Sequence, residues 1–282
     1  MKTIAFQGEY GAYSDLACRA AFPDAETVPC TSFKAAFEAV QNGLADMAMI
    51  PVDNTIAGRV ADVHHLLPNS DLFIIAEHFQ PIAHALLGTN DATLEDIKIV
   101  HSHIHALPQC RNLIEEMGLK PSVEADTASA AKRVAEFGDK THAAIASTLA
   151  ADIYGLKILK DNVQDEDHNT TRFLVLSAEP KMPSIETPTI SSLIFDVRNI
   201  PAALYKSLGG FATNNLSLAK LESYVNENFQ GAQFYCEVEG HPDTPAFNHA
   251  IEELGFYAND VKFMGAYPMH GFRTSVPHEQ KD

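Results

Sequence analysis

Short apolar runs alternate with amphipathic segments through the first 180 residues, and the turns between them are short. Runs rich in β-branched and aromatic residues predict strands, whereas apolar residues three or four positions apart predict helices. Strands are expected over Thr3–Gln7, Glu26–Cys30, Met47–Val52, Leu72–Phe79, Ile82–Leu87, Ile97–Val100, Pro121–Ala125, Ala143–Ala146, Lys157–Leu159 and Thr171–Leu176. Helical segments separate most of them, which is typical of an α/β fold with parallel strands.

The order of these segments predicts two lobes. The α/β rhythm restarts at residue 97, and the strand at 171–176 returns after the second set of segments is complete. We expect the chain to cross between the lobes near 77–81 and 160–168. The first lobe would then comprise about 1–77 plus 168–180, and the second about 78–167. A ligand cleft between the lobes would be lined by strand–helix turns and helix N-termini.

A proline-rich stretch, residues 179–188, follows and indicates a domain boundary after residue 180. The region 188–278 predicts the order strand, helix, strand, strand, helix, strand, which is that of a ferredoxin-like α+β domain. The segments are Ile190–Val197, Ala202–Phe211, Leu216–Val225, Ala232–Val238, Phe247–Phe256 and Val261–Ala266. Small domains of this kind often dimerise or bind a small effector.

The composition narrows the classes of partner. Lys and Arg total 20 against 37 Asp and Glu, a net charge of −17, which argues against nucleic acid or an anionic membrane as a partner. No apolar run approaches the roughly 20 residues of a membrane span, and the N-terminus lacks a secretory signal pattern. The four scattered cysteines form no CxxC pair, so we expect reduced thiols in a cytoplasmic protein.

The stretch DEDHNTTRFLVL, residues 165–176, places Asn169, Thr170, Thr171 and Arg172 at the start of a buried strand. Other polar side chains occupy similar places beside predicted strands and helices. The full set of candidate ligand-binding residues is Asn54, Thr55, Ser102, Gln109, Thr127, Ser129, Thr170, Thr171 and Arg172. Each Ser, Thr or Asn alone is typical of a cap or turn, and Thr127 with Ser129 would cap a helix over Ala130–Phe137. Together they are neutral donors and one cation, suited to a compact anion.

Other chemistries have weaker support. The sequence contains neither a dinucleotide-binding glycine loop nor a phosphate loop. His101, His103 and His105 would share one face of a strand and suggest zinc, but the strand is expected to end there and no carboxylate or thiol completes the set. Ser102 is not within the G-x-S-x-G pattern of hydrolases. We therefore expect neither a metal nor a cofactor.

Several of these motifs, in their order, resemble the prephenate dehydratase family. Thr171-Arg172-Phe173 matches the family's threonine-arginine-phenylalanine signature, and FQGEYGAYS resembles its opening turn. Further matches are the segment 50–58, IPVDNTIAG, the histidine–serine–histidine run with Gln109-Cys110, the segment 126–131, and 143–147. The resemblance implies a periplasmic-binding-protein-like catalytic region of type II, followed by an ACT regulatory domain.

The resemblance implies that one elimination removes CO2 and the ring hydroxyl from prephenate and yields phenylpyruvate. Thr171 would be the catalytic residue, donating a hydrogen bond to the departing hydroxyl, while Asn54, Ser102 and Gln109 orient the substrate. Arg172 would either pair with a substrate carboxylate or support the turn that presents Thr171, because adjacent strand residues face opposite sides. His168 is an alternative general acid, because a histidine side chain of this type can donate a proton near neutral pH.

The C-terminal domain would sense L-phenylalanine by the same resemblance. The effector residues would be Ala202, Ala203, Leu204, Asn215, Leu216, Leu221, Glu222 and Ser223. Ala202 stands where the family has Gly, and Tyr224 where it has Arg, so affinity for phenylalanine or the identity of the effector is open. Effector sites of this kind lie between subunits, which implies a dimer or tetramer.

Two alternatives are open at this point. One is arogenate dehydratase, because arogenate differs from prephenate only by an amino group in place of the side-chain keto group. The other is a non-catalytic two-lobed sensor of an aromatic amino acid or anion.

Overall fold

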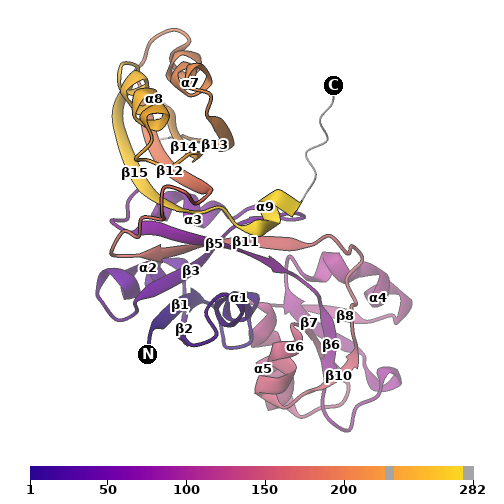
Figure 1. Ribbon diagram of the computed structural model, residues 1–282. Coiled ribbons are helices and arrows are strands. Elements are labelled where there is room, and N and C mark those ends of the chain that lie inside the picture. Colours follow the sequence, from indigo (N-terminus) through magenta and orange to yellow (C-terminus); the bar gives the residue numbers. More distant parts are fainter. Residues whose placement is uncertain (226–231, 276–282) are drawn as a thin grey trace. The chain divides into compact units, whose positions relative to one another are not determined.

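The computed structural model describes residues 1–225 and 232–275 (Figure 1). Its first sheet has the strand order β2 (Glu26–Cys30), β1 (Thr3–Gln7), β3 (Met47–Asn54), β11 (Thr170–Ser177) and β5 (Phe73–Pro81), and the short β4 (Gly58–Arg59) pairs with β3. The helices of this part are α1 (Tyr13–Ala21), α2 (Phe33–Gln41) and α3 (Ala61–Leu66). Strand β11 joins this sheet although it follows all strands of the second one, so the predicted late return is confirmed.

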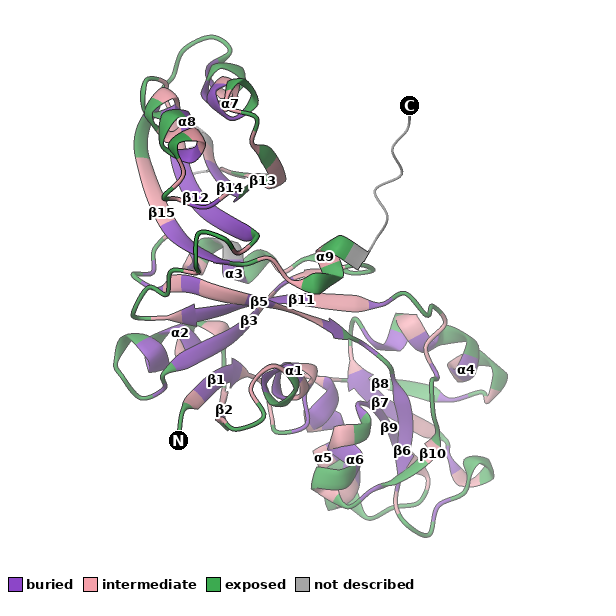
Figure 2. Cartoon of the chain, viewed as in Figure 1, coloured by how far each residue is buried: buried purple, intermediate pink, exposed green. Residues whose placement is uncertain are grey.

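The second sheet has the order β10 (Lys157–Lys160), β6 (Ala85–Gly88), β9 (His142–Ala146), β7 (Ile99–His103) and β8 (Lys120–Glu124). Its helices are α4 (Arg111–Glu116), α5 (Thr127–Phe137) and α6 (Thr148–Tyr154), with short 3₁₀ turns η1 (Leu94–Asp96) and η2 (Leu107–Cys110). The central strands of both sheets are buried (Figure 2).

The expectation of an α/β fold with parallel strands was wrong for β6. Strand β7 is parallel to β8 and β9, but β6 is antiparallel to both of its neighbours, β9 and β10. Strand β6 enters the second sheet directly from β5 of the first sheet, so it is not part of a strand–helix–strand unit with either of its neighbours. Mixed sheets of this kind are common, and the apolar run of β6 does not encode its direction.

Helix α5 begins three residues earlier than expected. Asp126, not Thr127 or Ser129, is its N-cap, and its carboxylate accepts a hydrogen bond from Ser129 N at 2.7 Å. The Ser129 hydroxyl in turn accepts from Asp126 N at 3.0 Å. This reciprocal capping box satisfies two backbone donors at the helix start, which explains the earlier boundary.

The two chain crossings lie next to each other. Ile82 N donates to Asn169 O, and Val163 N donates to His84 O, both at 2.9 Å. Gln164 also accepts from His84 N through its side chain, at 2.9 Å. The backbone of His84 is therefore held on both sides by the second crossing.

The C-terminal part has the predicted order of elements: β12 (Thr189–Val197), α7 (Ala203–Thr213), β13 (Ser217–Val225), β14 (Ala232–Glu239), α8 (Pro245–Gly255) and β15 (Ala258–Pro268), followed by α9 (Gly271–Ser275). The strands form an antiparallel sheet in the order β13, β14, β12, β15. Phe195, Phe211, Phe234 and Phe247 contribute to its core.

By residue contacts the chain divides into two units. The first comprises Met1–Val63 and His78–Phe173, and the second comprises His64–Glu77 and Leu174–Asp282. Strands β5 and β11 run through this division. The predicted domain limits at 180 and 188 stay predictions, and the predicted end at 278 lies outside the described residues.

Within the second unit, β15 passes close to the first half of β5. Gly265 has φ +135°, and a Cβ there would overlap with Ile74 O, so only glycine fits. Lys262 donates to the backbone oxygens of Pro68 and Ser70 at 2.9 and 2.7 Å. The 64–77 segment is thus bound to the C-terminal sheet by direct contacts.

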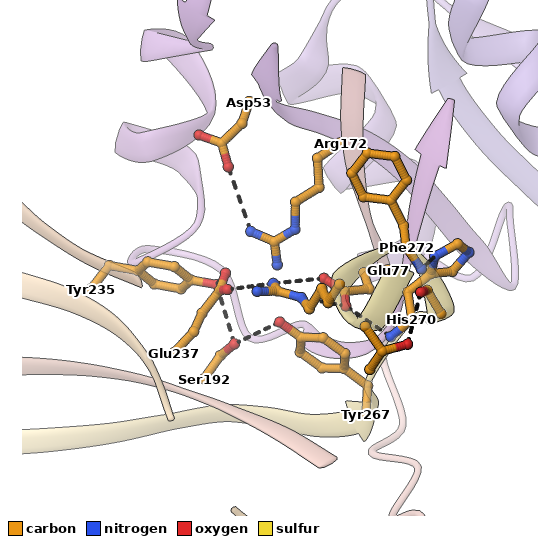
Figure 3. A network of polar contacts seen from close by, with 12 residues as sticks. Asp53, Glu77, Arg172, Ser192, Tyr235, Glu237, Tyr267, His270 and Phe272 are labelled. Carbon is orange, nitrogen blue, oxygen red and sulfur yellow. Dashed lines mark hydrogen bonds and ion pairs between the residues drawn. The ribbon is translucent and has the colours of Figure 1, made fainter. Parts of the chain in front are cut away.

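A buried ionic network adds to these contacts (Figure 3). Arg273 donates to both carboxylate oxygens of Glu77, at 2.7 and 2.8 Å, and to Glu237 at 2.8 Å. Both glutamate side chains are fully buried. The Tyr235 hydroxyl donates to Glu237 at 2.8 Å. Because an uncompensated buried charge is costly, the second unit depends on Arg273 to neutralise Glu77 and Glu237.

Among the described residues, no helix has the length and apolar character that crossing a membrane requires.

Candidate active site

Asn54, the last residue of β3, has an orientation that its own backbone determines. Its Oδ1 accepts hydrogen bonds from Ile56 N at 2.9 Å and from Ala57 N at 2.7 Å. A side-chain oxygen that caps the following turn is the usual use of asparagine at this kind of position. Backbone N–H groups can only donate, so the amide nitrogen of Asn54 must point the other way.

That nitrogen reaches Thr171 and Asn169. Asn54 Nδ2 donates to Thr171 Oγ1 at 2.9 Å and to Asn169 Oδ1 at 2.7 Å. The Thr171 hydroxyl is half-buried, and no described residue accepts a hydrogen bond from it. It thus receives a hydrogen bond from Asn54 and keeps its own proton available for a ligand.

The hydrogen bonds continue from Asn169 toward helix α1. Asn169 Nδ2 donates to Gln109 Oε1 at 2.8 Å, and His84 Nε2 lies 3.0 Å from the same oxygen. His84 Nδ1 lies 2.7 Å from the hydroxyl of Tyr13, the first residue of α1. We call these six side chains, in the order Thr171, Asn54, Asn169, Gln109, His84 and Tyr13, the polar relay.

Burial determines the charge state of the far end of the relay. His84 is 2% exposed, and desolvation lowers the pKa of its imidazole, although the hydrogen bond with Gln109 opposes that shift. Burial also raises the pKa of the Tyr13 phenol well above its usual value, with a smaller contribution from Cys110. Near neutral pH the relay therefore ends in a neutral imidazole and a protonated phenol.

Arg172 points away from Thr171. Its guanidinium lies 3.5 Å from the Asp53 carboxylate (Figure 3) and 5.9 Å from the centre of the Phe79 ring. Asp53 and Arg172 are the strand neighbours of Asn54 and Thr171, so the two pairs occupy opposite faces of the sheet. The side chain is 7% exposed. These contacts favour support of the strand over direct contact with a ligand.

Thr55 and Thr170 join the two strand ends. The Thr55 hydroxyl donates to His168 O at 2.8 Å and accepts from Thr170 N at 2.9 Å, while Thr55 N donates to Thr170 O at 3.0 Å. Both side chains are near Thr171, but the hydroxyl of Thr55 is used to hold the loop. The alternative acid His168 is exposed and lies 3.6 Å from Glu166.

The three remaining candidates, Ser102, Thr127 and Ser129, make no hydrogen bond to the relay within the described part of the chain. Ser102 is fully buried, and its hydroxyl donates to Ile145 O at 2.6 Å. Thr127 is the first residue of α5 and is 8% exposed, and Ser129 belongs to the capping box. The structure thus gives Ser102 and Ser129 local structural contacts, and their contact with a ligand stays a prediction.

The histidine run does not share one environment. His101 is buried, with Glu124 at 3.0 Å from Nδ1 and His142 at 2.8 Å from Nε2. His103 is the last residue of β7, and burial and His105 lower its pKa. His105 lies beyond the strand and is exposed.

The predicted effector residues lie around α7 and β13 of the second unit. Ala202 precedes α7 with a left-handed backbone (φ +58°), and Asn215 is left-handed too (φ +56°). Leu204 and Leu216 pack against the core of the sheet. Ala203 is buried, whereas Leu221, Glu222 and Ser223 lie along β13.

Sequence reasoning missed two members of the relay, Tyr13 and His84. A signal for His84 was present, since it is the one polar residue in the otherwise apolar run 82–88, directly after the predicted first crossing at 77–81. Tyr13 gave no such signal, because an aromatic residue at the start of a helix is ordinary packing. The sequence indicates Asn169 only as one of four polar residues at the start of a buried strand.

Comparison with known proteins gives one consistent result. The family model described as prephenate dehydratase matches residues 4–181. A Komagataeibacter europaeus protein named bifunctional N-acyl-homoserine lactone acylase/prephenate dehydratase is 47% identical over 274 residues, 96% of this chain and 98% of that protein. Arogenate dehydratase/prephenate dehydratase 1 of Arabidopsis thaliana is 39% identical over 281 residues, 94% of this chain and 72% of that protein.

A solved structure agrees over nearly the whole chain. The prephenate dehydratase of Arthrobacter aurescens in complex with L-Phe superposes with a TM-score of 0.87 at 28% identity, covering 95% of this chain and 90% of that one. The family match covers more than half of the residues, including the strand ends that carry Asn54 and Thr171. The chain therefore belongs to the prephenate dehydratase family.

Proposed function

We propose that the protein converts prephenate to phenylpyruvate by decarboxylating dehydration. The observation that carries this proposal is the Thr171 hydroxyl, which accepts from Asn54 and has no acceptor of its own among the described residues. The family membership supports the same reaction. Such a hydroxyl suits a reaction in which a neutral donor must meet a departing oxygen.

The chemistry needs little more than this donor. The bond between the ring and its carboxylate breaks, and its electron pair enters the ring as CO2 departs. The carbon–oxygen bond of the ring hydroxyl breaks on the other side, and the departing hydroxide takes up a proton to become water. Aromatisation drives both steps. Because an isolated threonine is a poor acid, Thr171 contributes a hydrogen bond that strengthens as charge develops on the oxygen.

The test begins with purified protein and prephenate, with phenylpyruvate as the measured product. Thr171→Val keeps the shape but removes the hydroxyl, and we expect kcat to fall by about 10²–10³, as when one oxyanion donor is removed. KM should change little, and Thr171→Ser should retain most of the activity. Thr141→Val is a matched control, because the Thr141 hydroxyl bonds locally to Asp139 at 2.8 Å. Wild-type protein that forms no phenylpyruvate would contradict the proposal and favour a non-catalytic sensor.

Arogenate is the second candidate substrate, because a relative carries both activities in its name. The described site residues do not include a group that clearly separates an amino from a keto side chain. The ratio of kcat/KM for the two substrates decides, and a strong preference for arogenate would overturn the prephenate assignment.

We further propose that the dehydratase activity is the protein's sole activity, although a relative is named as bifunctional. An acylase needs an activated nucleophile. Burial raises the pKa of the Cys110 thiol to about 12, and the Ser102 hydroxyl is engaged with Ile145 O. Incubation with an N-acyl-homoserine lactone should release no free fatty acid, and release at a steady rate would contradict this part of the proposal.

The C-terminal part of the chain, which contains β12 to β15, is proposed to be an ACT domain that binds L-phenylalanine. Its strand order and a related structure named as an L-Phe complex support this. The protein is proposed to assemble as a dimer or tetramer. We also propose that the catalytic region has a periplasmic-binding-protein-like fold. A cytoplasmic location is proposed as well, and four free cysteines support it. Calorimetric titration with phenylalanine that gives no heat of binding would refute the regulatory part.

A further inference from the structure

Tyr13 and His84 have no assigned part in the reaction, yet they complete the polar relay. A relay of amides and imidazoles has two possible directions, because each amide can present either its oxygen or its nitrogen to a neighbour. In one direction the Thr171 hydroxyl accepts, and in the other it must donate to position 54. Only the first direction leaves its proton for a substrate.

The direction at one end is set by the backbone. Ile56 N and Ala57 N oblige Asn54 to present its nitrogen to Asn169. Asn169 must then accept through Oδ1 and donate through Nδ2, so Gln109 receives that bond on Oε1. Because Gln109 Oε1 can only accept, His84 Nε2, 3.0 Å away, must carry a proton to donate to it. The arrangement is therefore consistent only with a histidine protonated at Nε2.

At the other end, the neutral imidazole must accept at Nδ1. The single hydroxyl of Tyr13 lies 2.7 Å from this nitrogen and also 2.7 Å from Ala83 O. Donation to His84 fixes the proton on Nε2, whereas donation to Ala83 O would suit a proton on Nδ1 and the reversed relay. The two rings meet edge to face, with their centroids 5.4 Å apart.

We propose that Tyr13 and His84 are positioning residues that hold the relay in the direction that leaves the Thr171 proton available. The proposal rests on the function given above for Thr171. The two residues act by fixing which groups of the relay donate and which accept, and not by contact with the substrate. The backbone of His84, held by Val163 and Gln164, keeps the imidazole in place for this role.

Two substitutions of His84 distinguish the role of Nδ1 from the role of Nε2. His84→Gln places an amide donor where Nε2 lies, and His84→Asn places a polar group near Nδ1 but leaves Gln109 without a donor. We expect kcat for prephenate to stay within about 5-fold of wild type in His84→Gln, which loses only the bond to Tyr13, since one hydrogen bond of about 1 kcal/mol is worth about 5-fold. The fall should be larger in His84→Asn, because Gln109 then has no donor to hold its oxygen and can turn its amide, which reverses the relay. KM should change less than kcat in both.

Tyr13→Phe removes the phenol while keeping the ring, and we expect a loss in kcat of about 5-fold for one hydrogen bond. Tyr10→Phe is the control, because the Tyr10 hydroxyl reaches only Thr27 O, at 3.3 Å. Equal activities of Tyr13→Phe and Tyr10→Phe would contradict the proposal. So would equal losses in His84→Gln and His84→Asn, because a role in packing alone predicts no difference between nitrogens.

Nitrogen-15 NMR of the histidine rings tests the direction without any substrate. The signal that is missing in His84→Gln identifies His84 among the 13 histidines, and we expect its protonated nitrogen to be Nε2 in wild type and a mixture of tautomers in Tyr13→Phe. A proton on Nδ1 in neutral wild-type protein would overturn the inference. If wild type is inactive on prephenate but His84 carries its proton on Nε2, the proposed function fails while the direction of the relay stands.

Discussion

Replacing Asn54 with aspartate exchanges a donor for an acceptor at almost constant shape. The oxygen that accepts from Ile56 N and Ala57 N is retained, and the second oxygen takes the place of Nδ2. That oxygen would stand about where Nδ2 now lies, 2.7 Å from Asn169 Oδ1 and 2.9 Å from Thr171 Oγ1. Two acceptors cannot share such distances, so Asn169 must turn its amide and Thr171 must turn its proton.

The magnitude follows from counting the bonds that are lost and regained. Asn54 loses two short donated hydrogen bonds, about 2 kcal/mol in all, and a long one to Thr170 O at 3.4 Å, but the new carboxylate accepts from Asn169 and Thr171 instead. We expect Asn54→Asp to lower the free energy of unfolding by about 2 kcal/mol at most. The Thr171 proton, however, is now directed to position 54. Loss of that donor should lower kcat by about 10²–10³, or about 2.7–4 kcal/mol in the barrier.

The assay pairs steady-state kinetics on prephenate with urea unfolding of the same preparations. Asn42→Asp makes the identical chemical change at an exposed position after α2 and should leave kcat unchanged. A second readout is His84, whose proton should move from Nε2 to Nδ1 in Asn54→Asp if the whole relay reverses. A variant that keeps kcat within about 3-fold of wild type, which is less than 1 kcal/mol, would refute the reasoning that Thr171 needs a free proton.

Four further outcomes are expected. Gly265→Ala should lower the free energy of unfolding by about 3 kcal/mol or more, because the added Cβ meets Ile74 O and the positive φ is strained; an unchanged urea midpoint would refute the close approach. Arg273→Met should cost about 3–5 kcal/mol in the same measurement, since two buried glutamates lose three hydrogen bonds, and a loss below 1 kcal/mol would show that they do not depend on it. Ala202→Gly should raise stability by about 0.5–1 kcal/mol by relieving a left-handed alanine, measured as a higher Tm. The folded-state pKa of His84 lies below the ordinary value of 6.5, so the unfolded state binds a proton first as the pH falls; wild type should lose stability below pH 6.5 down to the folded pKa, and His84→Gln should lack this component.

The sequence predicted most elements because their apolar runs are long enough to determine them. The strands that carry Asn54 and Thr171 were placed from such runs, and polar residues at their ends indicated the site. The direction of β6 could not be predicted, because its apolar run indicates a strand but not which strands it pairs with or in which direction. Neither could the meeting of Tyr13, His84 and Gln109, since residues 71 and 25 positions apart are brought together only by the folded chain crossings.

The turn at Asn54 helps to determine which groups of the polar relay donate hydrogen bonds and which accept them. A row of amides, like a row of water molecules in ice, has two proton arrangements, and nothing within the row prefers either. Here two peptide N–H groups, of Ile56 and Ala57, break that symmetry. Peptide groups do not titrate in water at any ordinary pH, unlike a carboxylate or imidazole used as general acid. At its Asn54 end the relay is therefore oriented by the main chain, and this contribution to the Thr171 donor does not depend on the acidity of the solvent.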